Sequence, residues 1–120
     1  MPNAKKVLVV EDEALLLFSI ADELRESGFE VFEASNADEA IELLQNHVDI
    51  ALMFTDIDMP GSMDGLRLSA AVRDRWPPVK IIVTSGKARP GSNDLPSEGR
   101  FMSKPYMPSA VVHAMKEMLG

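Results

Sequence analysis

The chain has 120 residues, of which 46% are hydrophobic and 26% charged, and it contains no cysteine. This length suits one core, so we expect residues 1–120 to form a single domain. The lack of cysteine excludes disulfides and thiolate metal sites and fits a cytoplasmic location. A net charge of −7 argues against a nucleic-acid surface, and no stretch approaches the roughly 18 apolar residues of a membrane span.

The first half of the chain alternates apolar runs with helical patterns. KVLVV at 6–10 and EVFEA at 30–34 are short apolar runs typical of buried strands. Between them, residues 14–27 carry apolar side chains at helical spacing, and a glycine follows where a helix can end. Asn36, with Glu39 three residues later, resembles a capping box. We therefore expect a second helix to begin there.

The second half continues the alternation. IALMFT at 50–55 and VKIIVT at 79–84 predict buried strands, and a short RFM at 100–102 predicts a fifth. A helix is expected at about 64–75, because Trp-Pro-Pro follows it, and another at about 108–119, with proline in its first turn. Five strands alternating with helices predict an α/β fold with a parallel sheet covered on both faces.

The segment GKARPGSNDLPSEG, residues 86–99, stands where the alternation requires one more helix. It contains Pro90, Gly91, Pro96 and Gly99. A proline inside a helix costs about 3 kcal/mol and a glycine about 1 kcal/mol relative to alanine. We therefore expect a loop or a single turn, so that the fourth helix is short or irregular.

Polar side chains follow four of the five predicted strands, at the edge where ligands of open α/β sheets bind. They are Glu11-Asp12-Glu13, Asp56 with Asp58, Thr84-Ser85-Gly86, and Ser103-Lys104-Pro105. Carboxylates about 4 Å apart repel by roughly 4 kcal/mol at an effective dielectric of 20, and a divalent cation relieves this repulsion. Oxygen-only donors favour Mg²⁺. Because a hydroxyl and a lysine suit phosphoryl oxygens, the set predicts Mg²⁺-assisted phosphoryl transfer to an aspartate.

This arrangement resembles a response-regulator receiver domain, the phosphoacceptor module of two-component signalling, and the resemblance covers nearly the whole chain. It rests on four motifs that occur in order at strand ends: Glu11-Asp12, Asp56 in TDIDMPGSMDG, Ser85-Gly86 and Lys104-Pro105. The resemblance implies a doubly wound, flavodoxin-like sheet of five parallel strands in the order 2-1-3-4-5.

The resemblance also implies a phosphoacceptor and a metal site. Asp56 would accept a phosphoryl group from a histidine kinase or a phosphotransfer protein. Four oxygen donors would hold Mg²⁺, namely the carboxylates of Glu11, Asp12 and Asp56 and the backbone carbonyl of Asp58. The only catalysis expected is slow self-phosphorylation and dephosphorylation, so the chain would be a signalling protein and not an enzyme.

Three further residues gain roles from the same resemblance. Ser85 and Lys104 would each bind a phosphoryl oxygen, and Ser85 is preferred to Thr84 because a small residue follows it. Phe101, three residues before the lysine, would be the switch aromatic that turns inward on phosphorylation. The Lys104–Pro105 peptide would be cis, as is usual in the family.

The chain departs from the family pattern in two segments. MPGSMDG, after the acceptor, is one residue longer than the usual MPxMDG, and we expect the loop to bulge near the metal. The stretch between Ser85 and Lys104 is a few residues shorter than usual. Because the face around it commonly meets partners in the family, the sequence leaves open the downstream protein target and whether a second copy of the chain is a partner.

Two competing functions remain open at the level of sequence. Asp56-Ile57-Asp58 also fits the nucleophile motif of haloacid-dehalogenase-like phosphohydrolases, although that motif normally ends the first strand. A pseudo-receiver would bind partners without phosphorylation, although the acid, hydroxyl and lysine set is intact. Phosphate-ester turnover would distinguish the hydrolase from a receiver.

Overall fold

The structure, a computed structural model, describes residues 4–87 and 99–120. Its elements in chain order are β1 (Lys6–Val10), α1 (Ala14–Glu26), β2 (Glu30–Ala34), α2 (Ala37–Asn46), β3 (Ile50–Asp56), α3 (Gly65–Arg75), β4 (Lys80–Ser85), β5 (Arg100–Ser103) and α4 (Pro108–Leu119). Every element boundary that the sequence predicted lies within one residue of these.

The five strands form one parallel sheet in the order β2-β1-β3-β4-β5, which confirms the predicted order. The chain moves outward from β1 to one edge and then crosses back through β3 to the other, so the strand order reverses between β1 and β3. In register, Val10 lies beside Thr55, Asp56 beside Thr84, and Ser85 beside Ser103. The polar residues that end these strands therefore meet at one edge of the sheet.

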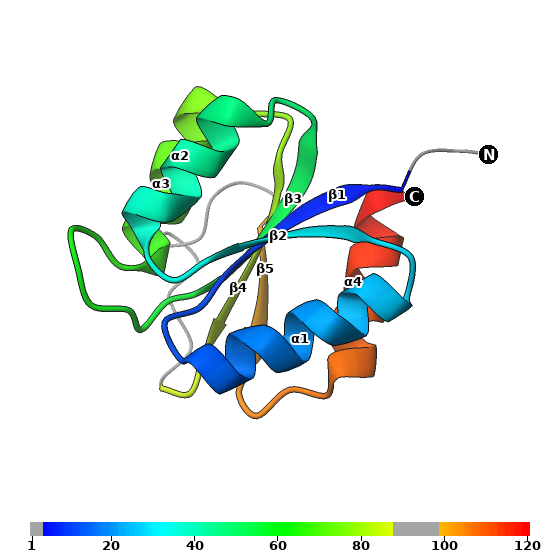
Figure 1. Ribbon diagram of the computed structural model, residues 1–120. Coiled ribbons are helices and arrows are strands. Elements are labelled where there is room, and N and C mark those ends of the chain that lie inside the picture. The colour runs from blue at the N-terminus through cyan, green and yellow to red at the C-terminus, as the bar shows by residue number, and fades with distance from the viewer. Residues whose placement is uncertain (1–3, 88–98) are drawn as a thin grey trace.

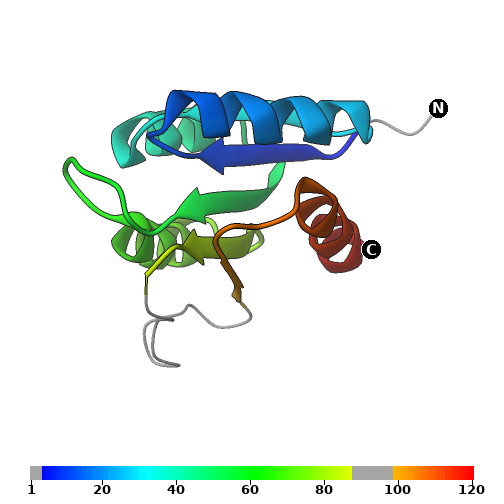
Figure 2. The same cartoon turned by 90° about the horizontal axis from the view of Figure 1, so that it is seen from below.

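Helices cover both faces of the sheet, as Figures 1 and 2 show: α1 and α4 on one face, α2 and α3 on the other. Alternate residues of β1 point to opposite faces. Leu8 and Val10 pack with α2 and α3, whereas Val7 and Val9 pack with α1 and α4. Burial on both faces explains why the strands are continuous apolar runs.

The helix ends follow the predicted caps, with one difference. The Asn36 side chain accepts a hydrogen bond from the backbone N–H of Glu39 at 2.8 Å, as a capping box requires. The Glu39 carboxylate, however, accepts from the backbone N–H and the hydroxyl of Ser35, at 2.8 and 2.9 Å. The reciprocal half of the box is thus displaced by one residue towards the N-terminus. Asp64 caps α3 through the N–H of Arg67.

The predicted loop or single turn at 86–99 falls largely outside the described residues, because residues 88–98 are not among them. The short or irregular fourth helix therefore stays a prediction, and the label α4 denotes the helix that begins at Pro108. Within residues 4–87 and 99–120, no helix has the length and apolar character needed to cross a bilayer.

Candidate functional site

Asp56, Lys104 and Glu11 converge at the carboxyl edge of the sheet, although they are far apart in the sequence. Lys104 Nζ lies 2.7 Å from Asp56 Oδ2 and 3.1 Å from Glu11 Oε1. Both carboxylate side chains are only 3% exposed, and the lysine is 22% exposed. The structure thus brings together a predicted acceptor, a predicted metal ligand and the predicted phosphoryl-binding lysine.

Backbone hydrogen bonds extend the sheet ladder past the strand ends and fix these segments. The N–H of Glu11 donates to Ala34 O at 3.0 Å, and the N–H of Lys104 donates to Ser85 O at 2.9 Å. Ile57, directly after Asp56, donates its N–H to the carbonyl of β4 residue 84 at 2.8 Å. The polar side chains therefore project from rigid backbone, which favours a defined site.

Burial and like charge act together on Glu11. The pKa of its carboxyl group is raised to about 7, mainly by desolvation and in addition by the Asp56 charge. The N–H of Glu13, 3.1 Å from Glu11 Oε2, and the Lys104 ammonium oppose this shift. For Lys104, burial by itself lowers the pKa, but its bonds to Asp56 and Glu11 outweigh burial and raise the pKa overall.

Three carboxylates at this edge fit a divalent cation. One oxygen from each of Glu11, Asp12 and Asp56 can be chosen so that all three lie within 4.8 Å of one another. Glu11 and Asp56 are buried, whereas Asp12 is exposed and leaves one side of the group open to water. Mg²⁺ is usually held by a few carboxylates with waters and phosphate oxygens, so this donor set suits it. The predicted role of the Asp58 carbonyl stays a prediction.

The Asp58 side chain takes part in a hydrogen-bond chain that the sequence analysis did not foresee. Ser85 Oγ donates to Asp58 Oδ2 at 2.6 Å, and Lys87 N–H donates to Ser85 Oγ at 3.0 Å. Asp58 N–H in turn donates to Asp56 Oδ1 at 3.0 Å. Ser85 thus bonds to a side chain beside Asp56, whereas the hydroxyl of Thr84 is buried without a hydrogen-bond partner among the described residues.

Gly65 is a site residue that sequence reasoning missed. A Cβ atom at this position would lie 2.0 Å from the backbone oxygen of Asp56 and 2.7 Å from the Ile57 Cα. The Gly65 N–H also donates to Ile57 O at 3.0 Å. The first turn of α3 therefore packs directly on the backbone of Asp56, and only glycine fits. The sequence signal for this residue was the final glycine of the motif TDIDMPGSMDG.

The loop after β3 has an exposed part that follows Asp58. Pro60, Gly61 and Ser62 are exposed, and Gly61 has a φ of +113°, which favours glycine. Ser62 Oγ donates to Asp38 Oδ1 at 2.8 Å, in the first turn of α2. The exposed part of the loop is thus tied to α2, while the buried Met59 anchors its start.

The aromatic residues of the β5 region pack on opposite faces of the sheet. Phe101 is half-buried against the cluster under α2 and α3, and its switch role stays a prediction. Tyr106 packs on the α1 and α4 side, edge-on to Phe54 at 5.4 Å between ring centroids. Burial raises the pKa of Tyr106 to about 12. The Lys104–Pro105 peptide between these aromatics is cis, as expected.

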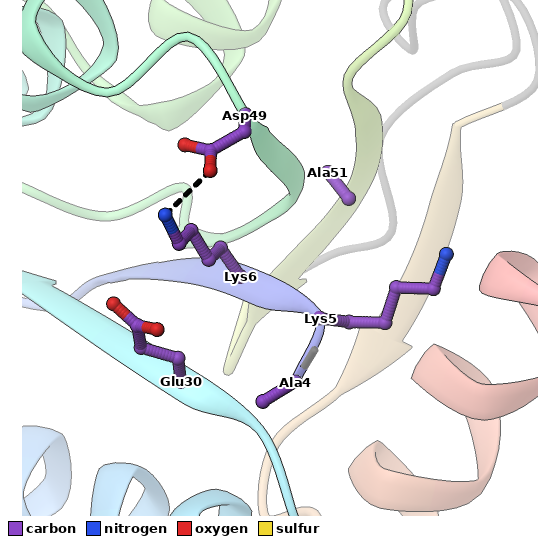
Figure 3. Close-up of a pocket in the computed structure, with 6 residues that line it drawn as sticks. All are labelled: Ala4, Lys5, Lys6, Glu30, Asp49 and Ala51. Atoms are coloured by element: carbon purple, nitrogen blue, oxygen red, sulfur yellow. Dashed lines mark hydrogen bonds and ion pairs between the residues drawn. The ribbon is translucent and has the colours of Figure 1, made fainter. Parts of the chain in front are cut away.

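A hollow of about 560 Å³ lies at the opposite, amino edge of the sheet (Figure 3). Its charged lining residues are Lys5, Lys6, Glu30 and Asp49. Two positive and two negative side chains balance, and Lys6 pairs with Asp49. This hollow therefore has neither the excess charge nor the buried acids of the carboxyl edge.

Comparison with known proteins agrees with this geometry. A family model, the response regulator receiver domain, matches residues 7–116. The response regulator receiver protein CpdR of Brucella abortus (strain 2308) is 30% identical over 96% of this chain and 97% of its own length. The chemotaxis protein CheY of Thermotoga maritima is 33% identical over 95% and 97%. The sensor kinase CckA of Brucella abortus is 34% identical over 99% of this chain, which spans only 13% of that kinase.

Solved structures of receivers share the fold. A response regulator receiver protein from Sinorhizobium medicae WSM419 aligns with a TM-score of 0.89 and 27% identity, over 97% of this chain and 94% of that one. The receiver domain of the hybrid histidine kinase CckA aligns with a TM-score of 0.81 and 29% identity, over 96% and 99%. Members of this family are signalling modules and not dedicated enzymes. The chain belongs to the response regulator receiver domain family.

Proposed function

We propose that this protein is a phosphoacceptor that receives a phosphoryl group on Asp56 in a two-component phosphorelay and passes the signal on by protein contacts. The observation that carries the proposal is the buried Asp56 carboxylate, held 2.7 Å from Lys104 Nζ beside two further carboxylates. A single buried acid with a lysine would be an ordinary ion pair. Three acids around one lysine leave an excess of negative charge that suits a cation.

Asp56 acts as the nucleophile in this proposal. One of its carboxylate oxygens forms a bond to phosphorus while the bond from phosphorus to the donor breaks, and the donor leaves with its electron pair. Lys104 would then pair with one phosphoryl oxygen, and the Ser85 hydroxyl would donate to another. Both groups lie at strand ends that are fixed by backbone hydrogen bonds, so only their side chains need to turn to reach an added group.

The metal donors would be the carboxylates of Glu11, Asp12 and Asp56 with the backbone carbonyl of Asp58. Bound Mg²⁺ supplies charge neutralisation for the transferred group and for the crowded acids. Lys104 contacts two of the same carboxylates. We therefore expect Lys104 to hold the acids together in the metal-free protein and to turn to a phosphoryl oxygen once Mg²⁺ is bound and Asp56 is phosphorylated.

The surface beside the acceptor suits a phosphodonor protein. A mainly apolar hollow of about 410 Å³ is lined by Leu16, Gly86, Lys104, Pro105 and Tyr106. Leu16 belongs to α1. Two large apolar side chains of the same helix, Leu15 and Phe18, are 82% and 62% exposed. They lie three residues apart and so share a helix face. A histidine kinase or phosphotransfer protein that covered this face would bring its phosphohistidine to Asp56.

Docking and chemistry can be separated by experiment. We expect Phe18→Ser to slow phosphorylation by a phosphotransfer protein that loads the wild-type chain, but not phosphorylation by acetyl phosphate. Val48→Ser is the matched control, because Val48 is 87% exposed but precedes β3 at the amino edge. Equal slowing by both variants would contradict docking on α1.

The phosphoacceptor proposal is tested by intact mass after incubation with acetyl phosphate, with and without Mg²⁺. We expect the wild type and Asp49→Asn each to gain one phosphoryl group in Mg²⁺ and Asp56→Asn to gain none. An unmodified wild type with an intact fold would point to a pseudo-receiver. Release of phosphate over many turnovers without an adduct would point to a hydrolase.

A further inference from the structure

The Ser85 hydroxyl already donates its only proton to a hydrogen bond in the structure. A serine hydroxyl carries one donor proton and two acceptor lone pairs. The proton goes to Asp58 Oδ2 at 2.6 Å, and a lone pair accepts from Lys87 N–H at 3.0 Å. The first distance is that of a charge-assisted bond between a hydroxyl and a carboxylate, which is stronger than a neutral one. Ser85 is only 2% exposed, so water does not replace this partner readily.

The Asp58 carboxylate is used here in an unusual way for a loop aspartate. Aspartates in turns commonly accept hydrogen bonds from backbone N–H groups a few residues on. Asp58 Oδ2 instead accepts from a side chain 27 residues away, on β4. Its own N–H donates to Asp56 Oδ1. Asp58 therefore links the acceptor carboxylate to the hydroxyl that the proposed function assigns to the phosphoryl group.

We propose that the Asp58 side chain is a latch that holds the Ser85 hydroxyl in the unphosphorylated state. The inference rests on the proposed function, in which Ser85 donates to a phosphoryl oxygen on Asp56. One proton cannot serve both acceptors, so phosphorylation requires Ser85 Oγ–H to turn from Asp58 to the phosphoryl group. No covalent bond changes in this turn, and the proton stays on Ser85. Asp58 is half-exposed, so its freed carboxylate can be hydrated.

The latch makes Asp58 a positioning residue that opposes loading of the site. Its removal frees the Ser85 proton before a phosphoryl group arrives, and it also removes a negative charge beside that group. These two effects differ in one respect. The first needs the Ser85 hydroxyl, whereas the second does not, so a double-mutant cycle separates them.

The test uses beryllofluoride, formed from beryllium chloride and sodium fluoride, as a non-covalent stand-in for the phosphoryl group. Its affinity is measured by calorimetry at saturating Mg²⁺ for the wild type, Asp58→Ala, Ser85→Ala and the double variant. We expect Asp58→Ala to bind about tenfold more tightly than the wild type, the order of one charge-assisted hydrogen bond. In the Ser85→Ala background the same change should gain about twofold or less.

Asp58→Asn provides a second variant that preserves side-chain shape and keeps a weaker acceptor, and it should tighten binding by a smaller factor. An equal gain in both Ser85 backgrounds, or no gain at all, would overturn the latch while leaving the phosphoacceptor intact. Failure of all four proteins to bind beryllofluoride would instead overturn the proposed function, and the latch with it.

Discussion

Both edges of the sheet carry side chains of both charges but use them differently. At the amino edge, Lys6 and Asp49 form an ion pair whose side chains are 29% and 58% exposed. At the carboxyl edge, Lys104 meets two carboxylates that are each 3% exposed. The acid at the amino edge has a lowered pKa, because Lys6 hydrogen-bonds to it. The acid at the carboxyl edge, Glu11, has a raised pKa, mainly because it is buried.

This difference shows why volume alone does not identify the site. The hollow at the amino edge, about 560 Å³, is larger than the hollow of about 410 Å³ beside Lys104. Its charges are balanced and partly in water, so they gain nothing from a ligand. Crowded, buried acids cost free energy until a cation joins them. A cation is therefore expected to bind where acids are crowded and buried, at the carboxyl edge, and mutations at the two edges should have different effects.

The largest effect is expected at Gly65, where the carboxyl edge has no room for a side chain. Gly65→Ala would place a Cβ 2.0 Å from Asp56 O, so the backbone must move. We expect the free energy of unfolding to fall by about 3 kcal/mol, measured by urea denaturation, with slower phosphorylation by acetyl phosphate. Gly86→Ala is the control, since its Cβ would meet Lys104 Cβ at 3.8 Å, an ordinary contact. Equal losses in the two variants would contradict the close approach.

Removal of a proposed metal donor should rank next. Asp12→Ala should weaken Mg²⁺ binding by roughly tenfold or more, since even residues that only support metal ligands cost about 10- to 100-fold when mutated. Calorimetric titration with Mg²⁺ measures this change. Asp49→Ala, which removes an acid from the other edge, should leave the affinity unchanged. A similar loss in both would mean that net charge, and not a local site, attracts the cation.

The raised pKa of Glu11 makes the carboxyl edge sensitive to pH. Because the folded protein keeps this proton up to about pH 7, Mg²⁺ must displace it below that pH. We expect Mg²⁺ affinity to rise, by at most about tenfold per pH unit, as pH increases towards 7, and then to level off. In the metal-free protein, the stability changes with pH in the opposite direction to the Mg²⁺ affinity. Folded Glu11 binds more proton than unfolded Glu11 between pH 4.5 and about 7, so stability falls as pH rises through this window.

Glu11→Gln tests this assignment, because glutamine cannot titrate. Its Mg²⁺ affinity should be weaker and should lose most of its dependence on pH between 6 and 8. An unchanged pH profile in Glu11→Gln would assign the titration to another group. Circular dichroism at each pH verifies that the fold is retained.

The smallest effect is expected at the amino edge. Asp49→Asn removes the partner of Lys6 in an exposed ion pair, and such pairs contribute little to stability. We expect the urea midpoint at neutral pH to stay within experimental error of the wild type. The lowered pKa of Asp49 implies that any contribution is present above its ordinary pKa and fades as pH falls below it. A large loss at neutral pH would contradict the contrast between the edges.

The sequence predicted most of the fold, because strands buried on both faces are continuous apolar runs and the helices carry clear caps. Asn36 and Pro108 mark helix starts where the structure has them. Part of the site could also be predicted from the sequence, since parallel strands place all their carboxyl ends at one edge. This rule alone brings Lys104 to Glu11, 93 residues away.

The features that the sequence did not predict depend on distances within loops. The pattern of side chains along a sequence does not encode such distances. Asp58 was given a role for its backbone carbonyl, but its side chain reaches Ser85 because the loop after β3 folds back towards β4. Gly65 had no side chain to suggest chemistry, and its role follows from contact with the Asp56 backbone. The Glu39 carboxylate accepts hydrogen bonds from Ser35, one residue before the predicted partner Asn36.

The most direct test of the central claim is to locate the phosphoryl group in the chain. After loading with acetyl phosphate and Mg²⁺, borohydride reduces an aspartyl phosphate to homoserine and releases phosphate, and peptide mass spectrometry then identifies the reduced residue. Homoserine at position 56 alone, dependent on Mg²⁺, is the result we predict. Homoserine at Asp12, at Asp58 or at the amino-edge Asp49, with Asp56 unmodified, would contradict the proposed acceptor.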